Sequence, residues 1–138
     1  MSDFDFRFDL PVEGWADQTV YSFKGPAVDG MDHYLLLALD RTLSDTALDG
    51  FATAQINIIT STLKNIETLK RAEITLGRLP AVELVLKWVL QDGLIRYKRY
   101  LFVVKEQMGF TFNCDFTKKS FGLLTEQMSQ VVRSLLHA

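Results

Sequence analysis

The sequence has 138 residues, of which 48% are hydrophobic and 23% are charged, and this length predicts one domain, residues 1–138, with a core large enough to need no metal or disulfide. Fifteen basic residues against 17 acidic ones give a net charge of -2, which argues against nucleic-acid binding. The lone Cys114, the absence of a signal-peptide pattern and the lack of any apolar run near 20 residues predict a soluble cytoplasmic protein that is not integrated in a membrane.

The first half of the chain predicts three strands and a helix. Residues 4–10 alternate aromatic and charged side chains, the pattern of a strand with one wet face, and residues 15–23 form a second strand. Residues 33–40 are apolar on both parities, which is typical of a central strand covered on both faces. Ser44 and Asp45 are candidate caps of a helix that extends to Leu63, with Gly50 making its start uncertain.

The second half predicts four strands and a closing helix. The strands cover residues 67–76, 81–91, 94–105 and 109–114, and the helix follows from the spacing of apolar residues between Phe121 and Leu135. Asp92-Gly93 is the signature of a two-residue type I′ hairpin loop. The sequence therefore predicts an α+β fold, with a six- to seven-stranded sheet and two main helices.

The two-residue loop predicts which side chains share each face of the hairpin. One face, expected beneath a helix, pairs Trp88 with Tyr97, Leu86 with Arg99, Leu84 with Leu101 and Val82 with Val103. The other face pairs Val85 with Tyr100, Glu83 with Phe102 and Lys87 with Lys98, and so mixes large apolar groups with charges.

Two helices are too few to cover both faces of such a sheet. Six or seven strands span about 30 Å, whereas one helix covers about 10 Å. With Leu35, Leu37 and Leu39 on the second face, the sequence predicts an exposed apolar patch and hence a partner. The alternative is that the first helix and long loops complete the cover.

Catalytic and metal-binding patterns are missing from the sequence. His33 and His137 have no second ligand at metal-binding spacing, and a cysteine such as Cys114 at a strand end is usually a small buried hydrophobe. Neither GxSxG, GxGxxG nor a P-loop occurs. We therefore expect no enzyme activity, no cofactor and no metal.

Three stretches carry a resemblance to a known family. They are the run from Pro11 to Val20, the turn from Gly77 to Ala81, and the segment from Trp88 to Val104. They resemble the DcrB-like domains of the Mog1/PsbP-like fold and, more narrowly, the Eag chaperones of bacterial type VI secretion. The resemblance covers nearly the whole chain. It implies an antiparallel sheet flanked by helices and a homodimer that shields the N-terminal transmembrane helices of an effector before the effector is loaded on the secretion spike.

The resemblance also implies a cargo groove built from the sheet and the first helix. Mapped by motif onto this sequence, with Val85 added from the same predicted face, the groove would use Val20, Ser22, Leu35, Leu37, Leu39, Gln55, Ile59, Leu63, Val85, Tyr100 and Phe102. Family members often have Gln where this chain has Tyr100. The alternative function is a Mog1/PsbP-like module that binds a small GTPase or another folded partner.

Overall fold

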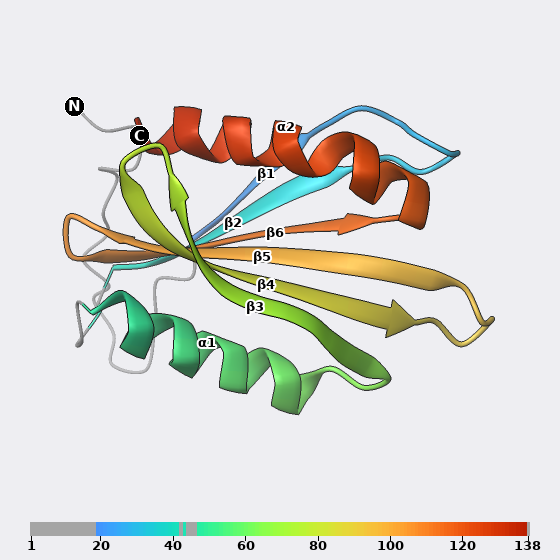
Figure 1. Ribbon diagram of the computed structural model, residues 1–138, viewed down its shortest axis with the longest axis horizontal. Coiled ribbons are helices and arrows are strands. Elements are labelled where there is room, and N and C mark those ends of the chain that lie inside the picture. Colours follow the sequence, from blue (N-terminus) through green and yellow to red (C-terminus); the bar gives the residue numbers. More distant parts are fainter. Residues whose placement is uncertain (1–18, 42, 44–46, 138) are drawn as a thin grey trace.

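In the computed structural model, which describes residues 19–41, 43 and 47–137, a single sheet lies between two helices (Figure 1). The elements in chain order are β1 (Val20–Lys24), β2 (Tyr34–Asp40), α1 (Leu48–Thr62), β3 (Ile66–Leu76), β4 (Leu79–Val89), β5 (Ile95–Lys105), β6 (Met108–Phe116) and α2 (Lys118–Leu136). The sheet is antiparallel in the order β1-β2-β6-β5-β4-β3. The α+β class with two main helices is thus confirmed, with six strands. The strand predicted at residues 4–10 lies outside the described residues, as do Ser44 and Asp45.

Each helix covers its own hydrophobic core. Beneath α2, a cluster joins the odd-numbered leucines of β2 to the phenylalanines of β6 and to Leu124, Met128 and Val132 of the helix. Beneath α1, a smaller cluster joins Phe51 and Ile56 to the even-numbered residues of β4 and β5. The strand period of two explains this division, because successive side chains point to opposite faces.

The hairpin between β4 and β5 differs from the prediction. Gly93 N donates a hydrogen bond to Leu90 O (3.0 Å) and Leu90 N to Leu94 O (2.8 Å), so three residues form the loop instead of two. Gly93 has a φ of +83°, as in a type I turn followed by a bulge. Val89 therefore pairs with Ile95.

A one-residue change of register exchanges every side chain of β5 between the faces. The predicted pairs are wrong: Leu84 lies opposite Tyr100, Val82 opposite Phe102, Leu86 opposite Lys98, Trp88 opposite Arg96, Val85 opposite Arg99, Glu83 opposite Leu101, and Lys87 opposite Tyr97. Tyr100 and Phe102 consequently belong to the core beneath α1, and Val85 belongs to the α2 face.

Phe51 fixes α1 against the middle of the sheet. Its ring lies over Gly109 of β6, where an added Cβ would come within 2.4 Å of Phe51 Cε1. The same ring meets Phe102 of β5 edge to face, with 6.4 Å between the ring centroids. Only glycine at position 109 leaves room for this packing.

We predict that Gly109→Ala lowers the free energy of unfolding by about 1–3 kcal/mol, because the new methyl group would overlap the Phe51 ring. The matched control is Gly122→Ala in α2, where nothing lies within 4 Å of the added Cβ and where alanine should stabilise the helix by up to about 1 kcal/mol. Chemical denaturation of both variants checks this. Equal stability of Gly109→Ala and wild type would contradict the packing of Phe51 on β6.

Candidate functional site

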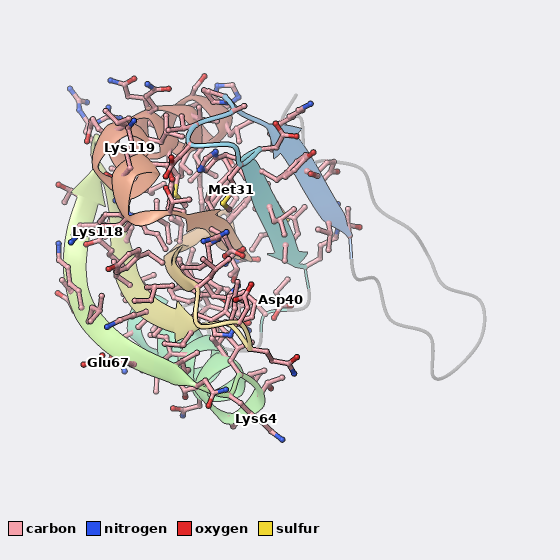
Figure 2. The ribbon with its side chains drawn as sticks, turned by 90° about the vertical axis from the view of Figure 1, so that its right-hand side faces the viewer. Met31, Asp40, Lys64, Glu67, Lys118 and Lys119 are labelled. Atoms are coloured by element: carbon pink, nitrogen blue, oxygen red, sulfur yellow. The ribbon has the colours of Figure 1, made fainter. Side chains whose placement is uncertain are left out.

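Helix α1 covers only part of its face of the sheet. Its core contacts involve β4 and β5, with Phe51 reaching Gly109 of β6. Figure 2 shows α1 at the lower end near Lys64, with β1 and β2 away from it on the right. Within the part of the chain that the structure describes, no helix covers the side chains of β1 and β2 on this face.

The uncovered surface, which we call the open face, consists of residues from three neighbouring strands. On β1 and β2, Val20 is 59% exposed and Leu36 is 40% exposed. The hydrogen-bonded register extends the surface across the strands: Ser22 lies beside Leu36, Leu36 beside Asn113, and Asn113 beside Tyr100. The described members of the open face are Val20, Ser22, Lys24, Tyr34, Leu36, Ala38, Asp40, Thr111 and Asn113, with the charged Lys24 and Asp40 at the ends of β1 and β2.

One side of α1 borders the open face. Arg71 of β3 donates a hydrogen bond to Thr53 Oγ1 (2.9 Å), so the Thr53 side of the helix faces the β3 edge. At 100° per residue, Gln55 and Ile58 then lie on the opposite side, toward β6. Ile58 is 58% exposed. The 15 residues of α1 contain a single charge, Asp49, which is unusual for a helix with a solvent-facing side.

The predicted cargo residues do not form one surface. Val20 and Ser22 belong to the open face, and Gln55 borders it, but Ile59 and Leu63 are partly buried in the α1 core. The others occupy two separate cores or the opposite face: Leu35, Leu37 and Leu39 are buried beneath α2, Val85 faces α2, and Tyr100 and Phe102 are buried beneath α1. The predicted set does not share a surface for two reasons. The even-numbered residues of β2, not the odd-numbered leucines, lie on the open face, and the register of the β4–β5 hairpin differs by one residue from the predicted one.

Sequence reasoning missed Tyr34, Leu36, Ala38, Ile58, Thr111 and Asn113. Residues 33–40 are not covered on both faces, since Tyr34, Leu36 and Ala38 are exposed. The signal lay in β6, where aromatic Phe110 and Phe112 alternate with polar Thr111 and Asn113. That alternation indicates one wet face, and pairing with β6 assigns the even-numbered residues of β2 to it.

Two polar side chains mark the border between the open face and the α1 core. Burial, together with the negative charge of Asp115, raises the pKa of Tyr100 to about 12, while a hydrogen bond with Asn113 opposes this shift, so the hydroxyl is neutral at physiological pH. Lys98 Nζ donates to Asp115 Oδ1 (2.9 Å) and lies 4.4 Å from the centroid of the Trp88 ring. Lys98 is therefore buried, with its charge paired with Asp115 and placed over the face of the Trp88 ring.

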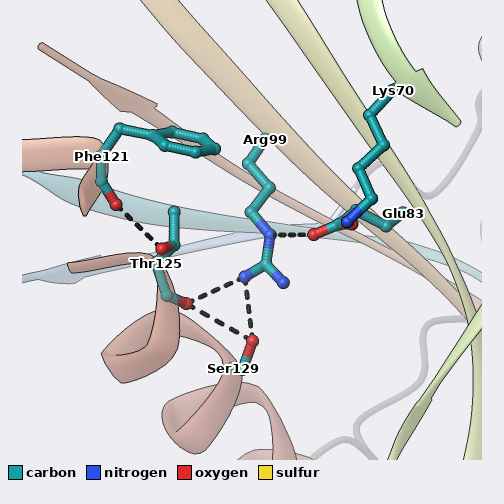
Figure 3. A network of polar contacts seen from close by, with 6 residues as sticks. All are labelled: Lys70, Glu83, Arg99, Phe121, Thr125 and Ser129. Carbon is teal, nitrogen blue, oxygen red and sulfur yellow. Dashed lines mark hydrogen bonds and ion pairs between the residues drawn. The ribbon is translucent and has the colours of Figure 1, made fainter. Parts of the chain in front are cut away.

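A buried ion pair lies on the opposite face, beneath α2 (Figure 3). Arg99 Nε donates to Glu83 Oε2 (2.7 Å), and Arg99 Nη1 donates to the carbonyl of Thr125 and to Ser129 Oγ (both 2.9 Å). Lys70 Nζ reaches Glu83 Oε1 at 2.7 Å. Burial alone would raise the pKa of Glu83, but the hydrogen bonds and charges of Lys70 and Arg99 outweigh it and hold that pKa below its usual value.

His33 and Cys114 are both buried, and their surroundings do not favour catalysis or metal binding. His33 Nδ1 lies 2.9 Å from Pro26 O, which can only accept, so Nδ1 carries a proton, and Nε2 lies within hydrogen-bond distance of Ser120 Oγ, at 2.7 Å. Burial, and to a lesser degree the charge of Asp115, raises the pKa of the Cys114 thiol to about 12, which leaves it a poor nucleophile. Within the described ranges, acidic, His and Cys side chains form no group of three suited to a metal ion.

The comparisons with known proteins identify the family. The sequence matches the DcrB family over residues 6–134. The chain belongs to the DcrB family. No curated protein matches this DcrB-family sequence. Neither helix of the described part is long and apolar enough to cross a membrane.

Solved structures confirm the fold of this DcrB-family chain. The Pseudomonas aeruginosa protein PA94, of unknown function, is 19% identical with a TM-score of 0.70, over 88% of this chain and 84% of that one. LpqN, described as involved in cell envelope biogenesis of Mycobacterium tuberculosis, is 14% identical with a TM-score of 0.50, over 76% of this chain and 62% of LpqN. At these identities the likeness establishes the fold alone.

We predict that Glu83→Gln flattens the acid dependence of stability. A carboxyl group with a lowered pKa contributes stability that is complete above its ordinary pKa, near 4.5, and is lost as pH falls through the lower native value. The wild-type free energy of unfolding should therefore fall more steeply on acidification than that of Glu83→Gln, which should be about 3 kcal/mol less stable at neutral pH. The control Glu126→Gln, on the surface, should keep the wild-type profile. Parallel profiles for Glu83→Gln and wild type would refute the role of this pair.

Proposed function

We propose that this DcrB-family protein is a chaperone or adaptor whose open face binds an apolar helix of a partner protein. The observation that supports this most strongly is the exposed row of Val20, Leu36 and Tyr34 beside a helix that has almost no charge. Contiguous apolar surface of this kind is typical of protein-binding sites. Ile58 extends the same surface onto α1.

The dimensions of the open face suit a helix. Three strands at about 4.8 Å spacing give a strip about 14 Å wide, and a helix with its side chains is about 10–12 Å across. α1 would form one wall and the three strands the floor. The polar groups on or beside the strip, Ser22, Gln55, Thr111 and Asn113, can bond small polar side chains of a helix that is otherwise apolar.

The resemblance to the Eag chaperones supports a more specific cargo. The bound helices would be the N-terminal transmembrane helices of a type VI secretion effector, held in the cytoplasm before the effector is loaded on the secretion spike. Burying these helices against the open face would keep them out of water until export. The alternative partner is a folded protein, which would contact the same surface without contributing an isolated apolar helix.

We predict that Leu36→Glu abolishes cargo binding while the protein still folds. Leu36 is 40% exposed, so a glutamate can stay hydrated in the free protein but must be desolvated against an apolar helix, at a cost of several kcal/mol. The neighbouring Leu37 is fully buried beneath α2, so Leu37→Glu should prevent folding. Circular dichroism checks the fold, and co-purification with an effector's N-terminal fragment checks binding.

The control for this pair is Leu123→Glu, an exposed leucine of α2 on the far side of the sheet, which should bind the fragment as wild type does. Normal binding by Leu36→Glu would show that the cargo site lies elsewhere. Binding of a folded partner but of no hydrophobic fragment would favour the alternative function.

We also predict that the protein forms a homodimer, because exposed apolar side chains outside the open face, such as Leu94 and Ile95, can be buried against a second copy. Sedimentation velocity from low to high micromolar concentration measures this. A strict monomer at the highest concentration would argue against the dimer that the Eag resemblance implies.

A further inference from the structure

A cavity of about 390 Å³ lies between the first turns of α2 and strands β3 to β5, on the side of the sheet opposite the open face. Leu69, Val85 and Phe121 form apolar parts of its wall, and Arg99 contributes a guanidinium group. The rest of the wall is polar and comes from Lys70, Glu83, Thr125 and Glu126. The volume of the cavity lies within the range of sites for small molecules. The proposed cargo surface makes no use of it.

Arg99 keeps hydrogen-bond donors for which the described residues supply no acceptor. Nε and Nη1 donate to Glu83, Thr125 and Ser129, whereas the two N–H groups of Nη2 have no acceptor among these residues (Figure 3). The Arg99 side chain is only 7% exposed. Nη2 itself is not fully enclosed, so an atom that enters from solvent can reach it. A guanidinium donor that opens into a cavity in this way can donate to a ligand acceptor, which would replace water there.

The electrostatic surroundings favour an anion. The first turn of α2 contains Lys118 and Lys119 and no acidic residue, although the helix dipole already makes this end positive. Both acidic side chains of the cavity wall are paired with bases: Glu83 with Arg99 and Lys70, and Glu126 with Arg133 at 3.5 Å. The positive helix start is therefore not neutralised by the acids of the wall.

We propose that this cavity binds an organic monocarboxylate. The carboxylate accepts a charge-assisted hydrogen bond from an N–H group of Arg99 Nη2, since Nε and Nη1 already donate to the protein. The apolar part of the ligand packs against Leu69, Val85 and Phe121. The site is independent of the open face, because the sheet separates the two.

Titration of the full chain with hexanoate, followed by ¹H–¹⁵N NMR, tests the proposal. Saturable shifts should include the amide signals of Leu69, Val85 and Phe121, and hexanoate should bind at least about tenfold more tightly than hexan-1-ol, because a hydrogen bond to a charged group is the stronger one. Arg99→Lys keeps the charge but removes the Nη2 donors and should weaken binding by at least about tenfold. Equal binding of hexan-1-ol, or no saturable shift with hexanoate, would overturn the proposal.

Surface variants decide the question even where Arg99→Lys fails to fold. Glu126→Gln removes a negative charge from the cavity wall and should tighten hexanoate binding by about two- to fivefold, whereas Lys118→Gln should weaken it by a similar factor. Leu123→Ala, on the exposed side of α2, is the matched control and should have no effect. A hexanoate affinity that is unchanged in both Glu126→Gln and Lys118→Gln would overturn the proposal. Leu36→Glu should bind hexanoate normally, so the outcome is separate from that of the chaperone test.

Discussion

A six-stranded sheet with one helix on each face cannot be fully covered, because a helix is about 10 Å across and six strands span nearly 30 Å. The two faces meet this constraint differently. Beneath α2, Tyr21, Phe23 and Val28 from the β1–β2 region pack onto the core and extend it to that edge. Beneath α1 nothing comparable is contributed by the described residues, and the position of Phe51 over Gly109 keeps the helix near the middle of the sheet. The open face follows from that position.

The composition of the two helices agrees with this division. α2 has lysines in its first turn, a capping box at Thr117 and Ser120, and an ion-pair network that ties it to β4 and β5 through Arg99. α1 has one charged residue and an exposed isoleucine on the side toward β6. A buried ion pair adds little net stability compared with apolar packing, so its benefit here is a fixed position for α2. The polar network therefore fixes the position of α2 on one face of the sheet. The open face, on the other side, has room for a helix of a partner.

The sequence allowed the fold class to be predicted but not the faces. Alternation, short apolar runs and helical spacing predicted every strand and helix within the described residues, because these patterns arise from local geometry. The length of the hairpin loop was predicted wrongly because a glycine with positive φ occurs in both two-residue and three-residue loops. A register shift of one residue then places every β5 side chain on the opposite face of the sheet. In β2, both parities are apolar, with leucines at 35, 37 and 39 on one side and Tyr34, Leu36 and Ala38 on the other. The exposed side could therefore be assigned only through the pairing of β2 with β6. The start of α1 at Leu48, with Ala47 as its N-cap, follows no capping signal in the sequence.

The account depends most on the claim that an apolar helix lies on the open face, between α1 and β1. Intermolecular NOEs measure this directly, with methyl-labelled protein and a hydrophobic helical fragment of the partner. The account predicts NOEs from the fragment to the methyl groups of Val20, Leu36 and Ile58, and none to Leu123 or Val131, which are exposed on α2. NOEs confined to the methyl groups of α2, with Leu36 and Ile58 unaffected, would contradict it.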